Sequence, residues 1–105
     1  MSTGFAGVGN LAQLEKIVRK AIRKLGKDVV SVNYNFDEDS TGDPSIYFRI
    51  VLTDAATRPG KLLTSAHRVE GVLDKEIRPH DWGIHLYSRF RSQAEQEELK
   101  DPKWA

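Results

Sequence analysis

The chain has 105 residues, of which 39% are hydrophobic and none is cysteine. This length supports one domain with a hydrophobic core, and the cysteine count excludes a disulfide scaffold, thiol chemistry and cysteine-ligated zinc or iron–sulfur sites. Sixteen Lys and Arg against fifteen Asp and Glu leave a net charge of +1, which argues against a general nucleic-acid coat protein. No apolar run reaches the roughly 18–20 residues that cross a bilayer. Residues 1–10 also lack the features of a signal peptide, so we predict a cytoplasmic protein without membrane association.

The N-terminal part predicts a flexible start followed by a helix. Residues 1–10 are rich in glycine and polar side chains. From residue 11 to 25, apolar residues recur at three- and four-residue spacing, as in an amphipathic helix. Asn10 and Gln13 can form a capping box at its start, and Gly26 suits a left-handed turn at its end. The apolar stripe consists of Leu11, Leu14, Ile17, Val18, Ala21, Ile22 and Leu25.

The hydrophobic period then changes to two, which is typical of strands with one buried face. The apolar residues stand at even positions: Val30, Val32, Tyr34 and Phe36, then Ile46, Phe48, Ile50 and Leu52. Residues 37–44 between the two runs are dense in turn formers. We therefore predict an antiparallel hairpin whose even-numbered face is buried.

A second helix and a third strand follow. Pro59 suits the first turn of a helix, and the helix should end before Pro79. Its apolar stripe consists of Leu62, Ala66, Val69, Val72, Leu73 and Ile77. The third strand is predicted from Trp82 to about Phe90. Ser92 and Glu95 have the spacing of a capping box that opens a short helix over residues 93–100.

The order α-β-β-α-β predicts a two-layer α+β sandwich. A right-handed strand–helix–strand connection places the second helix on the apolar face of the sheet, where the first helix must also pack. The expected fold is a ferredoxin-like unit lacking its first strand, with a three-stranded sheet, two helices on one face and a short C-terminal helix. Residues 11–91 form the predicted domain, and residues 92–105 form the C-terminal helix and tail.

The odd-numbered positions of the strands should point away from the helices; we call this side of the sheet the odd face. Its candidate binding or interface residues are Asn33, Asn35, Tyr47, Arg49, His85, Tyr87, Arg89 and Arg91. Tyr and Arg are favoured at protein–protein interfaces, and a small sheet with an unpaired edge favours self-association. The leading hypothesis is therefore an interaction module that forms a homodimer or small homo-oligomer, or binds another protein. Single-stranded RNA is the alternative ligand, because aromatic side chains stack on bases and arginines bind phosphate.

The first helix carries a basic patch. Its residues are Lys16, Arg19, Lys20, Arg23, Lys24 and Lys27, against the single acidic residue Glu15. A solvated helix face is the first explanation, since cations in the last turn also suit the helix dipole. An anionic partner, either RNA or an acidic protein, is the other.

The chain has three histidines that could ligate a metal, His67, His80 and His85. They do not form a His-Glu-x-x-His motif, and the alternation of the third strand directs His85 away from the second helix and its His67. Ser65-Ala66-His67 and Gly83-Ile84-His85 resemble phrases of the cytoplasmic C-terminal domain of cation-efflux transporters. That resemblance implies the α-β-β-α-β order, dimerisation and a metal-responsive role. Further ligands of that family have no counterpart in this sequence, so we predict no metal site and keep a metal-responsive regulatory domain as a lesser alternative.

The sequence contains no residue pattern typical of a catalytic site. Ser65, Ser88 and Ser92 have no evident base and orienting partner, and a two-layer domain of this size offers little room for a deep pocket. We therefore predict no catalytic residues, no enzyme activity and no cofactor.

The acidic link between the first two strands partly resembles a calcium-binding loop. Asp37, Asp39 and Gly42 fit three positions of such a loop, but Thr41 and Phe48 replace two of its ligands, so no calcium site is predicted.

Overall fold

The computed structural model describes residues 11–104. Helix α1, Leu11–Arg23, buries Leu14, Val18 and Ala21 along the predicted stripe. Gly26 has a φ of +91°, which confirms the predicted left-handed turn after this helix. The predicted flexible start and the cap at Asn10 lie outside the described residues.

Strands β1, Val29–Glu38, and β2, Pro44–Leu52, form the predicted antiparallel hairpin. Both strands extend into the predicted link, so the turn covers only residues 39–43. The register shifts between Val29 and Ser31, and Val30 between them is 46% exposed. The prediction that Val30 faces the core is wrong, because this bulge changes the alternation and Val29 packs against the core instead.

After β2, a 3₁₀ turn, η2 (Ala55–Thr57), precedes helix α2, Leu62–Ile77. The predicted helix start at Pro59 is wrong. Gly60 has a φ of +84°, a left-handed conformation that an α-helix does not contain, so the helix begins beyond it. The end before Pro79 is confirmed.

Pro79 opens a single helical turn, α3 (Pro79–Trp82), and Gly83 ends it with a φ of +66°. The third strand, β3 (His85–Ser92), therefore begins later than predicted, and Trp82 lies in α3. Helix α4, Gln93–Leu99, has the predicted capping box: the Ser92 hydroxyl accepts from the Glu95 amide at 3.0 Å, and the Glu95 carboxylate accepts from the Ser92 amide at 3.2 Å. A 3₁₀ turn, η3 (Pro102–Trp104), follows.

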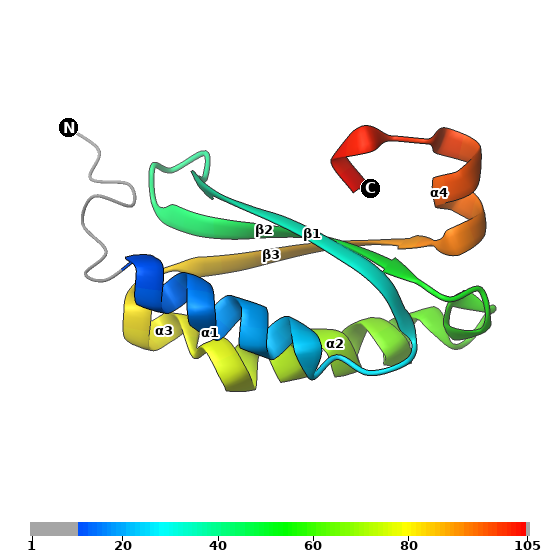
Figure 1. Cartoon of the computed structure of the whole chain (residues 1–105), viewed down its shortest axis with the longest axis horizontal. Helices are drawn as coiled ribbons and strands as arrows, with labels where there is room; N and C mark the ends of the chain where they lie inside the picture. The colour runs from blue at the N-terminus through cyan, green and yellow to red at the C-terminus, as the bar shows by residue number, and fades with distance from the viewer. Residues whose placement is uncertain (1–10, 105) are drawn as a thin grey trace.

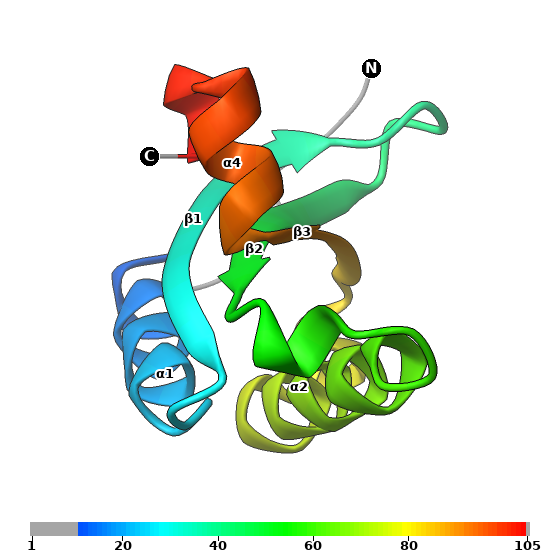
Figure 2. The same ribbon diagram turned by 90° about the vertical axis from the view of Figure 1, so that its right-hand side faces the viewer.

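The sheet has the order β1-β2-β3, with β2 antiparallel to β1 and parallel to β3. Helices α1 and α2 lie on one face, whereas α4 and η3 lie over the other (Figures 1 and 2). This arrangement is the predicted two-layer α+β sandwich with a short C-terminal helix. In its core, even-numbered strand residues pack with the buried stripes of the two helices. Examples are Ile46, Phe48 and Ile50 from β2, Leu14 from α1 and Leu73 from α2.

None of the helices within residues 11–104 combines the length and hydrophobicity that crossing a membrane requires.

Candidate functional site

The odd face carries its candidate residues in rows across the three strands. Asn35, Tyr47 and Tyr87 are register partners, and Asn33, Arg49 and Arg89 form the next row. His85 and Arg91 lie toward the two ends of β3, paired with Ser45 and Val51 of β2. The sequence-predicted binding residues therefore lie on one face, opposite to the face that packs on α1 and α2.

The C-terminal segment, residues 93–104, folds back over one end of this face (Figure 1). The Arg49 Nε donates to the carbonyl oxygen of Lys103 at 2.8 Å. The Arg91 guanidinium lies 4.2 Å from the ring centroid of Trp104 and 3.6 Å from the Asp101 carboxylate. Trp104 is only 6% exposed as a result. Two of the predicted binding arginines thus hold the chain's own C-terminal segment.

The hairpin turn borders the other end of the odd face. The Tyr87 hydroxyl donates to Asp39 Oδ2 at 3.0 Å, and His85 Nε2 lies 3.3 Å from Asp43 Oδ2. The Thr41 hydroxyl and backbone amides also donate to Asp39, and these bonds, led by the Thr41 hydroxyl, lower the pKa of its carboxyl well below the ordinary range. The hydrogen bond to Asp39, more than burial, raises the pKa of the Tyr87 phenol. The turn is therefore fastened to β3.

An open groove of about 540 Å³ lies between the turn and the C-terminal segment. Its lining includes four cationic side chains and two carboxylates: Arg49, Arg89, Arg91 and Lys103, with Asp37 and Asp101. The Tyr47 and Tyr87 rings stack beside each other, with centroids 5.1 Å apart and an interplanar angle of 16°. Tyr87 nevertheless stays 42% exposed, so the stack leaves part of its ring open to solvent.

Arg89 differs from the other two arginines of the odd face. Its side chain is exposed and has no hydrogen bond, ion pair or ring contact with any residue between 11 and 104. It lies two residues from Tyr87 on the same strand, about 7 Å along the chain. The groove thus combines an open aromatic surface with an uncompensated cation.

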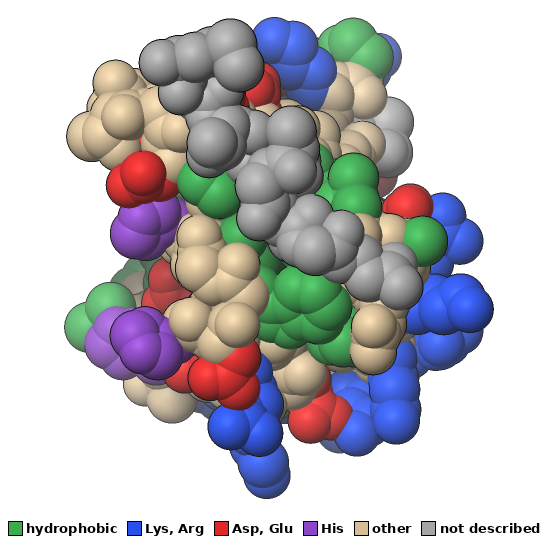
Figure 3. Space-filling view, turned by 90° about the vertical axis from the view of Figure 1, so that its left-hand side faces the viewer, with side chains coloured by type: hydrophobic (Ala, Val, Ile, Leu, Met, Phe, Trp, Pro, Cys, Tyr) green, Lys and Arg blue, Asp and Glu red, His purple; other side chains and the backbone are tan. Residues whose placement is uncertain are grey.

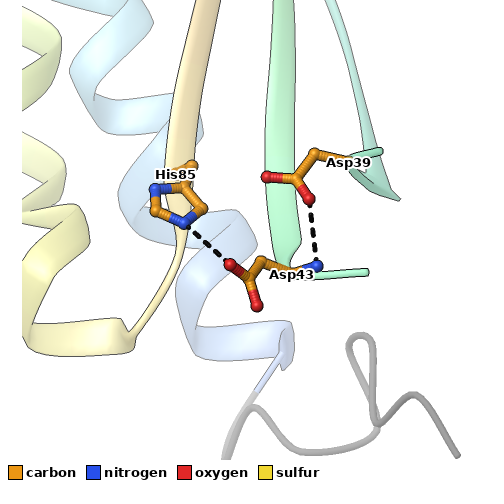
Figure 4. Close-up of side chains that lie close together, drawn as sticks. All are labelled: Asp39, Asp43 and His85. Atoms are coloured by element: carbon orange, nitrogen blue, oxygen red, sulfur yellow. Dashed lines mark hydrogen bonds and ion pairs between the residues drawn. The ribbon is translucent and has the colours of Figure 1, made fainter. Parts of the chain in front are cut away.

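Asp39, Asp43 and His85 bring three possible metal ligands together (Figure 4). One ligand atom from each lies within 4.8 Å of the other two. However, Asp39 Oδ1 already accepts from Thr41 and from the Asp43 amide, and Oδ2 accepts from Tyr87. Both oxygens of the Asp39 carboxylate therefore accept hydrogen bonds from the protein itself. A metal ion that bound Asp39 would have to displace some of these donors.

The basic patch lies away from the groove, on the flank formed by α1 (Figure 3). Arg19 pairs with Glu15 at 3.0 Å, and Lys24 pairs with Glu76 of α2. Four other members face solvent and make no hydrogen bond or ion pair with a residue in the range 11–104: Lys16, Lys20, Arg23 and Lys27. The structure therefore separates the two surfaces that the sequence predicts.

Sequence reasoning missed the groove's two borders. The sequence pattern places Asp39 and Asp43 only in a link of turn formers, and it gives Trp104 only a place in the C-terminal tail. Trp104, two residues after Pro102 and beyond the end of a polar helix, is the one local signal that this segment packs against the rest of the domain.

Comparison with protein-family models, curated proteins and solved structures finds no match for this chain.

Proposed function

We propose that the chain is a binding module that holds single-stranded nucleic acid in the groove of the odd face. One observation carries this proposal: the exposed, stacked Tyr87 ring lies beside Arg89, which has no partner among residues 11–104. An aromatic surface stacks on a base of any sequence, and an unpaired guanidinium binds the adjoining phosphate. Lys103 at the opposite wall adds a second cation.

The groove favours a flexible strand over a duplex or a flat protein surface. The hairpin turn and the C-terminal segment rise at its two ends, so a ligand must enter between them. Unstacked bases can be splayed onto such a surface, whereas a duplex hides its bases. Arg49 and Arg91 would not contact the ligand, because both are held by the C-terminal segment.

Self-association through the sheet, the leading hypothesis from the sequence, would compete for the same surface. The C-terminal segment covers the Val51–Arg91 end of the odd face within one chain, which reduces the area that a second copy could bury there. We therefore rank nucleic acid first and treat a second copy as the competing occupant.

The test is fluorescence anisotropy with a short mixed-sequence RNA oligonucleotide at low and moderate salt. Tyr87→Ala should weaken binding about 5- to 150-fold, since a base stack contributes roughly 1–3 kcal/mol. Tyr87→Phe keeps the ring and loses only the hydroxyl bond to Asp39, so it should bind nearly as well as the original chain. Thermal melts confirm that each variant is folded.

Lys20→Ala, on the basic patch of α1, is the control for nonspecific attraction. If this variant loses affinity and Tyr87→Ala does not, the RNA binds to the basic patch and the proposal is wrong. Sedimentation velocity without RNA reports a second copy; a dimer that Tyr87→Ala dissociates would assign the groove to self-association.

A further inference from the structure

The outer edge of β3 is a second surface of interest, because no strand among residues 11–104 pairs with it. Over residues 11–104, β3 pairs only with β2, in an unbroken register from His85 to Ser92. The opposite edge, on β1, is distorted by the bulge at Val29–Ser31. Bulges and covering segments protect an edge strand, whereas a regular one presents unpaired peptide groups. Of the two edges of the sheet, the edge of β3 is thus the one whose regular backbone can pair with another strand.

A groove runs beside this edge, between β3 and α2; we call it the edge groove. One hollow of about 340 Å³ is lined by Glu70, Gly71, Leu73, Asp74, Leu86 and Ser88. A second, of about 470 Å³, shares Asp74 and Leu86 and continues toward Gly83 and His85. The shared residues join the two hollows into a channel along the first half of the strand. The half-buried Leu86 gives it an apolar floor, above the fully buried Leu73.

The wall of the edge groove that α2 forms is acidic. Glu70 and Asp74 are exposed, and neither carboxylate has a partner among the described residues. Gly71 between them bears no side chain, and a Cβ added there would meet nothing within 4 Å. A ligand of the edge groove should therefore carry positive charge.

A second copy of the chain fits this edge poorly. Pairing two β3 strands about a two-fold axis would bring two α2 helices together, because α2 lies alongside β3. Glu70 and Asp74 of both copies would then face one another, and like charges at close range repel. A single extended strand without a helix of its own avoids this conflict.

We propose that the edge groove binds an extended peptide with Lys or Arg at every second position. The peptide backbone adds a fourth strand to the sheet at β3, as in β-strand addition elsewhere. Alternate side chains then point toward α2, where their aliphatic stems cover Leu86 and their charged ends reach Glu70 and Asp74. The intervening side chains lie on the odd face beside Tyr87 and Arg89, where a further cation would be repelled.

The probe is a capped peptide of alternating Lys and Thr, added to the ¹⁵N-labelled full chain and followed by amide NMR shifts and hydrogen exchange. Amides of β3 should shift and exchange more slowly, and those of β1 should not. The double variant Glu70→Gln/Asp74→Asn should bind about two- to thirtyfold more weakly, the range expected for two exposed ion pairs. Glu97→Gln/Glu98→Gln on α4 removes the same charge away from the edge and should leave the affinity unchanged.

A peptide of the same sequence, N-methylated at alternate residues, separates backbone pairing from charge attraction. It should not bind, because it cannot donate to the edge of β3. Equal binding of the methylated peptide, or equal loss in the two double variants, would overturn the proposal. If the amides of β3 exchange more slowly at higher protein concentration without any peptide, the edge pairs with a second copy of the chain instead. The RNA experiment addresses the other face, so each proposal fails by its own measurement.

Discussion

Asp39 is the side chain on which the hairpin turn depends. It accepts from the Thr41 hydroxyl at 2.5 Å and from the amides of Thr41 and Asp43, and it receives the Tyr87 hydroxyl from β3. Each of these bonds is stronger when the acceptor is charged, so the folded turn favours the ionised carboxylate. This contribution to stability is present above the pKa of Asp39 in the unfolded chain and is lost as the pH falls through its lower folded value.

Thr41→Val tests this account at a single residue. The substitution removes the bond that contributes most to the shift, so the pKa of Asp39 should rise toward its ordinary value. Carboxyl-carbon NMR titration measures the change directly. Thr57→Val is the matched control, because the Thr57 hydroxyl donates to the backbone carbonyls of Thr53 and Asp54, which precede η2. An unshifted Asp39 in Thr41→Val would contradict the bonding described here.

Residue patterns predicted the composition of the odd face but not which of its residues are free. The alternation of strands fixes the side of the sheet on which Arg49, Arg89 and Arg91 lie. Whether each has a partner depends on contacts between distant parts of the chain: Arg49 bonds to a residue 54 positions away, and Tyr87 to one 48 positions away. No local period encodes such contacts, so three arginines that look equivalent in sequence differ in the structure.

Sequence patterns predicted the ends of helices correctly where nearby residues of the same element satisfy its backbone groups. The capping box at Ser92 and the left-handed turn at Gly26 were predicted because the required side chains stand within a few residues of each other. The start of α2 and the start of β3 were predicted wrongly because glycines at 60 and 83 adopt positive φ angles. Glycine permits that conformation without requiring it, so the sequence alone does not decide the boundary.

Two glycine substitutions should have opposite effects on stability. Gly71 lies within α2 where an added Cβ meets nothing within 4 Å, so Gly71→Ala should stabilise the chain by about 1 kcal/mol. Gly26 has a φ of +91°, so Gly26→Ala should cost about 1–3 kcal/mol through backbone strain. Denaturant unfolding at equilibrium measures both. A destabilising Gly71→Ala would mean that the helix face at this position packs against something in the free protein.

The whole molecule has a net charge of +1, but its charges are sorted by surface. Cations line the outer side of α1 and the groove of the odd face, whereas carboxylates line the edge groove and the hairpin turn. The two proposed recognition surfaces follow from this segregation, and they differ in the charge of the ligand that each would prefer. The two proposed ligands meet only at β3, where Tyr87 and Arg89 border both surfaces.

The central claim is that the odd-face groove, not the basic patch, receives single-stranded nucleic acid. The most direct test maps amide and side-chain NMR shifts of the ¹⁵N-labelled chain during titration with a short RNA oligonucleotide at moderate salt. We predict that the changes centre on Asn35, Tyr47, Tyr87 and Arg89 and extend to Lys103. Changes confined to α1, with the odd face unaffected, would contradict the proposed function.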